Sequence, residues 1–140
     1  MPLISGRVLL GKLKEDNFDL DNFSDFNQNK QLHSQTFNED SKINVKAKFN
    51  THLQSQSIKK INNEILISFI GEIYNEDGYE SSFFEFIYDQ YKKKSVKDFL
   101  LSLNGTFSLF LHDFKKNKTI IAVDRVSSKP LYFFSDKNYL

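Results

Sequence analysis

The segment from residue 103 to residue 134, LNGTFSLFLHDFKKNKTIIAVDRVSSKPLYFF, constrains the fold of this chain more than any other. Large apolar residues at every second position from Thr106 to Leu111 have the period of a strand with one face on a core. A lysine-rich turn separates it from a β-branched run, Thr119 to Val123, which is expected to pair back as a hairpin. The loop Asp124 to Pro130 then leads to a third predicted strand, Leu131 to Phe134.

Further strands and a helical region are predicted before this segment. An apolar run from Ile4 to Leu10 predicts a buried strand, and alternation from Ile43 to Phe49 predicts a strand with one polar face. Glu64 to Ile70 is an apolar run rich in residues that favour strands. Apolar residues then recur at helical spacing from Phe83 to Tyr91 and from Val96 to Leu103, which predicts two helices or one broken helix. Because strands stand before and after the helices, the order predicts an α+β fold with an antiparallel sheet.

Residues 14–42 form a polar segment rich in Asn, Asp, Gln, Ser and Lys. Its few large apolar residues could line one side of a helix from about Leu20 to Gln31, and the remainder is expected to be a mobile loop. With 140 residues, of which 39% are hydrophobic, the chain is long enough to bury one substantial core. Residues 1–140 are therefore predicted to form a single domain.

The chain contains no cysteine. This excludes disulfides, thiolate metal sites and a cysteine nucleophile within these residues. His33, His52 and His112 lie far apart without paired ligand spacing, so neither a metal site nor a cofactor is predicted. His112, inside an apolar strand, is interpreted as a structural residue.

The net charge of the chain is +1, which points to neither a nucleic-acid partner nor an acidic membrane. Lysine runs occur at Lys59-Lys60, at Lys92 to Lys94 and at Lys115-Lys116. Because these runs are spread along the sequence, they are interpreted as solvated faces and not as a phosphate-binding patch. Positions 1–13 show no signal-peptide pattern and no run long enough to cross a bilayer, so a cytoplasmic location is expected.

Two segments resemble a known family. Residues Phe69 to Asn75, FIGEIYN, agree in six of seven positions with the motif Phe-Asn-Gly-Glu-Ile-Tyr-Asn. Between residues 103 and 132, LNG, Phe107, Asp113, DR and KPLY match, in order, a segment that reads approximately LNGMFAFALWD and then ARDRFGIKPLYY in asparagine synthetases. The chain therefore resembles the class II glutamine amidotransferase domain of those enzymes. The resemblance implies an N-terminal-nucleophile (Ntn) hydrolase fold, an αββα four-layer sandwich with antiparallel sheets, or a trimmed version of it.

The nucleophile of the family is replaced. Family members begin Met-Cys-Gly-Ile-x-Gly, and the Cys exposed by removal of Met attacks the glutamine carboxamide. This chain begins MPLISG, so Ile4 and Gly6 align and Pro2 stands at the nucleophile position. Since proline has no nucleophilic side chain, no thiol-based glutamine hydrolysis is expected. Loss of Met1 would expose a secondary amine that could serve as a base or form an iminium, which stays open as an alternative.

Residues that hold the substrate in the family are also changed. His33 matches a family His, but residues 34–37 replace the Arg-Gly-Pro-Asp that follows it in a loop before the next strand. The nearest basic candidates for the Arg that binds the substrate carboxylate are Lys46 and Lys48, whose ammonium groups cannot reproduce an Arg fork. Glu80 falls near the Asp that meets the substrate amine in the family, and it is equally suited to the first turn of a helix.

The oxyanion-hole motif keeps its frame and loses its donor. In the family, the Asn side chain and the Gly backbone N–H stabilise the oxyanion, and loss of one donor typically costs about 2.7 to 4 kcal/mol of transition-state stabilisation. Here Ile70 replaces the Asn, Gly71 could still supply its N–H, and Glu72 could still meet an amine. The alternative is a strand that ends in a Gly turn, with Glu72 and Asn75 as exposed turn residues.

These replacements predict a catalytically degenerate domain without glutaminase activity. By resemblance to β-lactam synthetases and lasso-peptide cyclases, it would be a structural or docking module for an ATP-dependent amide-forming synthetase. The Ser-Gly-Gly-x-Asp-Ser motif of the synthetase half is missing from these residues. Two alternatives remain: an active or residual amidotransferase of the asparagine-synthetase type, and a small-molecule module that binds an amino acid. An unpaired edge strand could also favour a homodimer.

Overall fold

The computed structural model describes residues 3–8, 33–39, 43–49, 57–74, 83–129 and 131. The chain divides into two compact units, residues 1–58 with 132–140, and residues 59–131, which are described separately below. The predicted helix from Leu20 to Gln31 lies outside the described residues, as does the predicted third strand apart from Leu131. None of the described helices has the length and apolar composition needed to cross a bilayer.

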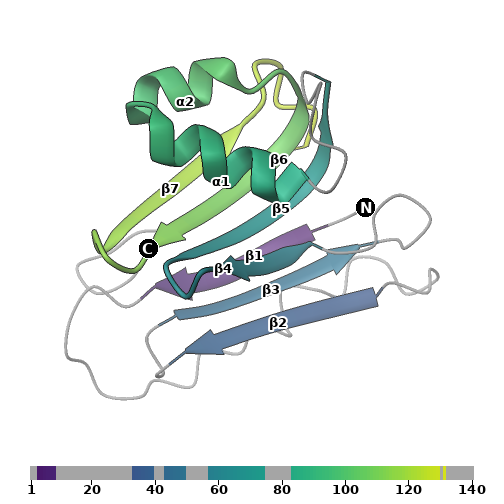
Figure 1. Ribbon diagram of the computed structural model, residues 1–140. Coiled ribbons are helices and arrows are strands. Elements are labelled where there is room, and N and C mark those ends of the chain that lie inside the picture. The colour runs from purple at the N-terminus through teal and green to yellow at the C-terminus, as the bar shows by residue number, and fades with distance from the viewer. Residues whose placement is uncertain are drawn as a thin grey trace. The chain divides into compact units, whose positions relative to one another are not determined.

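The first unit contains a three-stranded antiparallel sheet. Its strands are β1 (Leu3–Val8), β2 (His33–Glu39) and β3 (Ile43–Phe49), and β3 lies between the other two (Figure 1). The alternating strand has the predicted bounds, and its Val45 is fully buried. The N-terminal strand is confirmed as far as its last described residue, Val8.

Strand β2 corrects the expectation of a loop for residues 31–40. It pairs with β3 along its whole length, so that Phe37 lies opposite Val45. The polar composition of β2 concealed the strand, because Phe37 is the only large apolar residue between His33 and Glu39. Pairing with an apolar neighbour strand, and not local β-propensity, decides such a case.

The second unit is built on a four-stranded antiparallel sheet. The strands β4 (Ile58–Ile61), β5 (Ile65–Ile73), β6 (Gly105–Asp113) and β7 (Lys118–Val123) lie in that order, and the predicted hairpin forms β6 and β7. Strand β4 was not predicted. It is joined to β5 through Asn62 and Asn63, whose φ angles of 50° and 54° are those of a two-residue hairpin turn.

Two helices cover one face of this sheet, as Figure 1 shows. They are α1 (Phe83–Lys93) and α2 (Val96–Ser102), which confirms the predicted pair. The helices α1 and α2 are separate because Ser95 is the N-cap of α2. Its hydroxyl oxygen accepts a hydrogen bond of 3.1 Å from the backbone N–H of Asp98. Glu85 in the first turn of α1 and Lys92 and Lys93 in its last turn complement the helix dipole.

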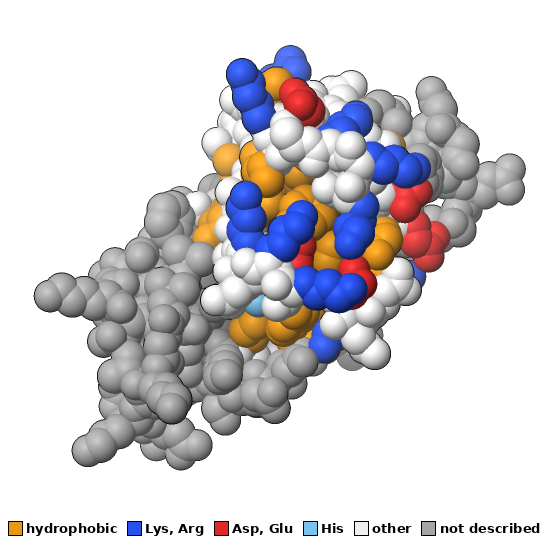
Figure 2. All heavy atoms as spheres, turned by 60° about the vertical axis from the view of Figure 1, so that its left-hand side comes forward, with side chains coloured by type: hydrophobic (Ala, Val, Ile, Leu, Met, Phe, Trp, Pro, Cys, Tyr) orange, Lys and Arg blue, Asp and Glu red, His pale blue; other side chains and the backbone are white. Residues whose placement is uncertain are grey.

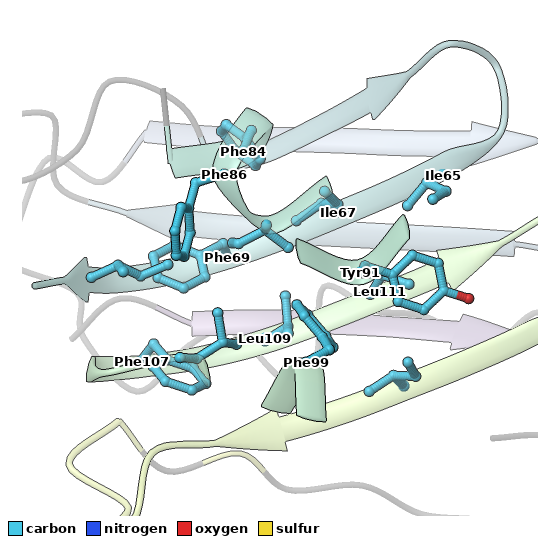
Figure 3. Close-up of a cluster of buried hydrophobic side chains, with 14 residues drawn as sticks. Ile65, Ile67, Phe69, Phe84, Phe86, Tyr91, Phe99, Phe107, Leu109 and Leu111 are labelled. Atoms are coloured by element: carbon cyan, nitrogen blue, oxygen red, sulfur yellow. The ribbon is translucent and has the colours of Figure 1, made fainter. Parts of the chain in front are cut away.

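The core lies between the helices and the sheet (Figure 3). Alternate residues of β5, among them Ile67 and Phe69, point toward the helices together with Leu109 of β6. Phe99 of α2 is fully buried among them, which contributes roughly 1.5 to 3 kcal/mol for a side chain of this size. Tyr91 of α1 meets the edge of Phe99 with ring centroids 5.7 Å apart.

The other face of β5 is buried as well. Leu66 and Ile70 alternate with the residues that face the helices, and Phe110 lies beside them on β6. Burial on both faces explains why β5 reads as a continuous apolar run and not as an alternating strand.

Candidate functional site

The candidate site lies at the end of β5. Ile70, Gly71 and Glu72 follow one another there, opposite Ser108, Phe107 and Thr106 of β6. The strand continues through Gly71 to Ile73, so the predicted Gly turn is wrong. The prediction of a turn failed because glycine occurs both in turns and at places inside a strand where another backbone approaches closely. The sequence alone does not distinguish these two roles.

The close approach at Gly71 is unusually tight. Its φ angle is +128°, and a β-carbon placed there would lie 1.9 Å from the carbonyl oxygen of Thr106. A β-carbon on Gly105 would similarly lie 2.0 Å from the carbonyl oxygen of Glu72. Both glycines are therefore required by the packing of the two backbones, whether or not the site has a chemical role.

The backbone N–H of Gly71 points away from β6. Hydrogen bonds join Tyr74 N to Asn104 O (2.7 Å) and Phe114 N to Glu64 O (2.9 Å) at the two ends of the β5–β6 ladder. Because bonded positions alternate in an antiparallel pair, Gly71 falls between bonded pairs, and its N–H is directed toward the opposite edge of β5. That is the direction in which a backbone donor for a ligand would have to point.

The side chains on either side of Gly71 differ sharply in exposure. Ile70 stands at the position of the family's Asn donor. It is only 3% exposed to solvent, and its hydrocarbon side chain cannot donate a hydrogen bond. Glu72 is exposed, so its carboxylate can meet a cation or an amine. The site therefore combines the backbone N–H of Gly71, the exposed carboxylate of Glu72 and the buried apolar side chain of Ile70.

A second segment that matches the family pattern, the loop from Asp124 to Lys129, is hydrogen-bonded to the same part of β6. The carboxylate of Asp124 accepts hydrogen bonds from the backbone N–H groups of Phe107 (3.0 Å), Val126 (2.9 Å) and Ser128 (3.2 Å), and from the Ser128 hydroxyl. The hydroxyl of Ser108 donates to the carbonyl oxygen of Lys129.

These contacts determine the charge state of Asp124. Burial by itself would raise the pKa of this carboxyl, but the hydrogen bonds from Ser128, Val126 and Phe107 outweigh burial and lower the pKa to about 2. Arg125 is adjacent in sequence but forms no ion pair with Asp124 among the described residues, because backbone amides occupy the carboxylate and the Arg125 side chain is exposed. An Asp that bonds the N–H two residues later is a local signal for such a loop.

The fold thus brings three matched motifs together through strand pairing, a backbone hydrogen bond and the Asp124 carboxylate. Asn104 accepts the N–H of Tyr74, and Phe107 lies opposite Gly71 while it donates to Asp124. The LNG segment, the FIGEIYN segment and the DR loop therefore meet on β6.

The remaining predicted site residues are placed as follows. Lys46 lies in β3 of the first unit, opposite Ser5 and Thr36, and its side chain is outside the described part. Pro2 and Glu80 are also outside the described residues. The structure therefore brings together only Ile70, Gly71 and Glu72 of the predicted set.

Two buried polar groups beside the core are structural. His112 Nδ1 lies 2.9 Å from the Thr119 hydroxyl oxygen, and its ring meets the edge of Phe114, as expected for a strand residue. The Tyr91 hydroxyl donates a hydrogen bond of 2.8 Å to Asp113. Among the residues that the structure describes, no three His, Asp or Glu side chains cluster as a metal site would require.

The family assignment follows from comparison with known proteins. A family model described as a glutamine amidotransferase domain matches residues 40–140, a range that includes β3 to β7, both helices and the three motifs that meet on β6. Neither the curated proteins nor the solved structures include a match to the chain. The matched range is well over half of the sequence, and its motifs are those joined in the fold, so the chain belongs to the glutamine amidotransferase domain family.

Proposed function

We propose that this chain is a glutamine amidotransferase-like domain without glutaminase activity, which serves as a structural or docking module for an ATP-dependent amide-forming synthetase. The observation that carries this proposal is the burial of Ile70 at the position of the oxyanion donor. A buried hydrocarbon side chain cannot stabilise the oxyanion, and one missing donor slows such reactions about 10²- to 10³-fold.

The nucleophile position supports the same conclusion. Pro2 offers no thiol or hydroxyl, and no cysteine exists elsewhere in the sequence to take its place. A backbone N–H at Gly71 and a carboxylate at Glu72 remain, but these groups bind and orient; they do not attack a carboxamide. Loss of both the nucleophile and a donor leaves no route for thiol-based hydrolysis.

What is retained supports a role for the folded domain itself. Gly71 and Gly105 allow β5 and β6 to approach, and Asp124 holds the following loop against Phe107. These residues preserve the frame of the motifs while the reactive groups are replaced. A domain that supports or docks another protein needs this frame and not the chemistry.

We infer that residues 1–140 form one domain of the Ntn-hydrolase type, an αββα sandwich or a trimmed version of it. Support comes from the four-stranded antiparallel sheet with two helices on one face, which is the α+β arrangement that one half of such a sandwich requires.

The glutaminase part is tested by incubating the full chain with L-glutamine and measuring released glutamate and ammonia. We expect release no faster than in a protein-free control. The Pro2→Ala variant is the matched comparison, because it removes the secondary amine that could replace the thiol. Turnover that Pro2→Ala abolishes would identify an amidotransferase using the terminal amine, and turnover that survives in this variant would identify another nucleophile; either result overturns the proposal.

The docking part is tested by purifying the tagged full chain from its native host. We expect an ATP-dependent, adenylating amide-forming synthetase to co-purify in stoichiometric amount. Failure to recover such an enzyme, together with measurable heat when glutamine is titrated into the chain, would instead indicate a small-molecule binding module.

A further inference from the structure

Lysines from each of the three runs, interpreted from the sequence as separate solvated faces, lie at one end of the four-stranded sheet. Lys59 is the exception, since its Nζ lies 3.2 Å from Glu85 in the first turn of α1. Lys92 Nζ, from the end of α1, lies 3.0 Å from Glu64 Oε2 at the start of β5. Lys115 Nζ, from the turn between β6 and β7, bonds the other oxygen of the same carboxylate. Residues from two runs therefore share one carboxylate.

Two further lysines, Lys60 of the third run and Lys116 beside Lys115, contact aromatic rings at the same end of the sheet. Lys60 Nζ of β4 lies over the Phe114 ring, 4.4 Å from its centroid. Lys116 Nζ lies 5.0 Å from the Tyr91 ring centroid and 3.8 Å from Asp113 Oδ2. Contacts of this kind hold the lysine stems on apolar surface while the ammonium groups face water.

We use the term lysine end for this surface of seven lysines. They are Lys60, Lys92, Lys93, Lys94, Lys115, Lys116 and Lys118. Lys94 directly follows the last turn of α1, and Lys118 lies opposite Asp113 in the β6–β7 pair. The carboxylates among them are Glu64, Asp89 and Asp113, so four positive charges are in excess within this set. Figure 2 shows lysine side chains gathered over this face, with apolar side chains between them.

Much of this charge is available to a partner. The side chains of Lys93, Lys115 and Lys116 are each more than 60% exposed although they lie near carboxylates. Lys94 and Lys118 are exposed and make no ion pair within the described residues. A chain with a net charge of only +1 therefore carries a local excess at one place.

We propose that the lysine end is the surface through which this domain binds a carboxylate-rich surface of a partner protein. The inference rests on the proposed docking function and names the chemistry of the partner. Lysines pair with carboxylates at the rim of protein interfaces, where they accelerate association and select the partner.

The pattern of charges favours carboxylates over the phosphates of a nucleic acid. Glu64 is partly exposed among the lysines and would repel a backbone that carries a charge at every nucleotide. The basic side chains of this surface are all Lys, and none is Arg, whose planar fork suits phosphate best. A protein surface can place single carboxylates against the exposed lysines on either side of Glu64.

The test uses the full chain and a fluorescein-labelled peptide of about ten glutamates, followed by fluorescence anisotropy at low salt and at physiological salt. Reversing two charges with Lys94→Glu and Lys118→Glu together is expected to weaken binding about tenfold at low salt. Arg125→Glu with Lys129→Glu is the matched control, since it changes the net charge equally outside the lysine end. It is expected to weaken binding less than about threefold.

The outcomes separate the alternatives. If Lys94→Glu with Lys118→Glu and Arg125→Glu with Lys129→Glu weakened peptide binding equally, binding would depend on net charge alone. That result would overturn the proposal. Tighter binding of a single-stranded DNA of equal charge would make this a phosphate-binding surface and would also overturn it. Thermal unfolding checks that the variants fold, and Lys94→Gln with Lys118→Gln provides a milder change that should weaken binding about threefold. Glutamine turnover would refute the proposed function without altering these affinities.

Discussion

The carboxylate of Asp124 lies 3.0 Å from the backbone nitrogen of Phe107, and Phe107 is the residue that faces Gly71 across β5 and β6. One residue of β6 thus connects the loop after β7 with Gly71 of β5. The connection is made by a carboxylate and a backbone amide, so it does not depend on any catalytic side chain.

Replacing Asp124 with Asn should destabilise the domain by about 2 to 3 kcal/mol at neutral pH, because the groups around the carboxylate are all donors and an amide supplies N–H groups of its own. Urea unfolding measures this. Asp89→Asn, which removes a carboxylate paired with an exposed lysine, should cost less than about 1 kcal/mol and serves as the control.

The same variant tests the pH dependence. The pKa of Asp124 is lowered to about 2 in the folded chain, against about 3.9 in an unfolded one, so its contribution is present above pH 4 and is lost as the pH falls toward 2. Wild-type stability should therefore decline over this range by about 2 kcal/mol more than that of Asp124→Asn. Parallel curves for the two proteins would contradict the assignment.

Gly71→Ala should cost about 3 kcal/mol or more, because alanine is strained at φ +128° and its β-carbon would meet the Thr106 carbonyl oxygen. Thermal unfolding would report the loss. Glu72→Ala, one residue further along the same strand and exposed, should change stability by less than about 0.5 kcal/mol. A Gly71→Ala protein as stable as the control would show that β5 and β6 can separate at this point.

Tyr91→Phe removes the 2.8 Å hydrogen bond to the buried carboxylate of Asp113 and should cost about 1 to 2 kcal/mol. Burial, together with the hydrogen bond to Asp113 and its negative charge, raises the pKa of Tyr91 to about 12. Its contribution is therefore present below pH 10, the usual pKa of tyrosine, and is lost as the pH rises toward 12.

Urea unfolding at pH 8 and pH 11 distinguishes this pair from an ordinary surface contact. The stability gap between wild type and Tyr91→Phe should narrow at the higher pH. Tyr88→Phe, which removes a hydroxyl that accepts a hydrogen bond from exposed Asn62, is the matched control and should cost less than about 1 kcal/mol at pH 8. A constant gap for Tyr91→Phe would argue against the Asp113 contact.

Ile70→Asn should destabilise the domain by about 3 kcal/mol without producing glutaminase activity, because it buries an amide in an apolar site and leaves Pro2 in place. Ile70→Val keeps the site apolar and should cost only about 0.5 to 1.5 kcal/mol. Unfolding and glutamate release are measured on the same preparations. Glutamate released by Ile70→Asn would mean that the missing donor, and not the missing thiol, limits the chemistry.

Local patterns proved sufficient for most elements of the second unit. The spacing of Phe83 to Tyr91 predicted α1, and the hairpin of β6 and β7 followed from its β-rich runs, because a repeating apolar period reflects one buried face. Strand β4 was missed since Lys59 and Lys60 interrupt its two isoleucines, and the Asn62-Asn63 turn was the only signal. Strand β2 was missed because its own residues have little β-propensity and no apolar alternation, and the strand is formed by its pairing with β3.

The sequence by itself determined what this protein lacks and which segments repeat an apolar period. No cysteine is available to attack a carboxamide, and Ile70 carries no donor, whatever the fold. Only the tertiary structure decided which distant residues meet: Gly71 with Phe107, Phe107 with Asp124, and Lys92 with Lys115 around Glu64. The reason is physical, since strand register and turn geometry bring together groups whose separation along the chain has no periodic signature.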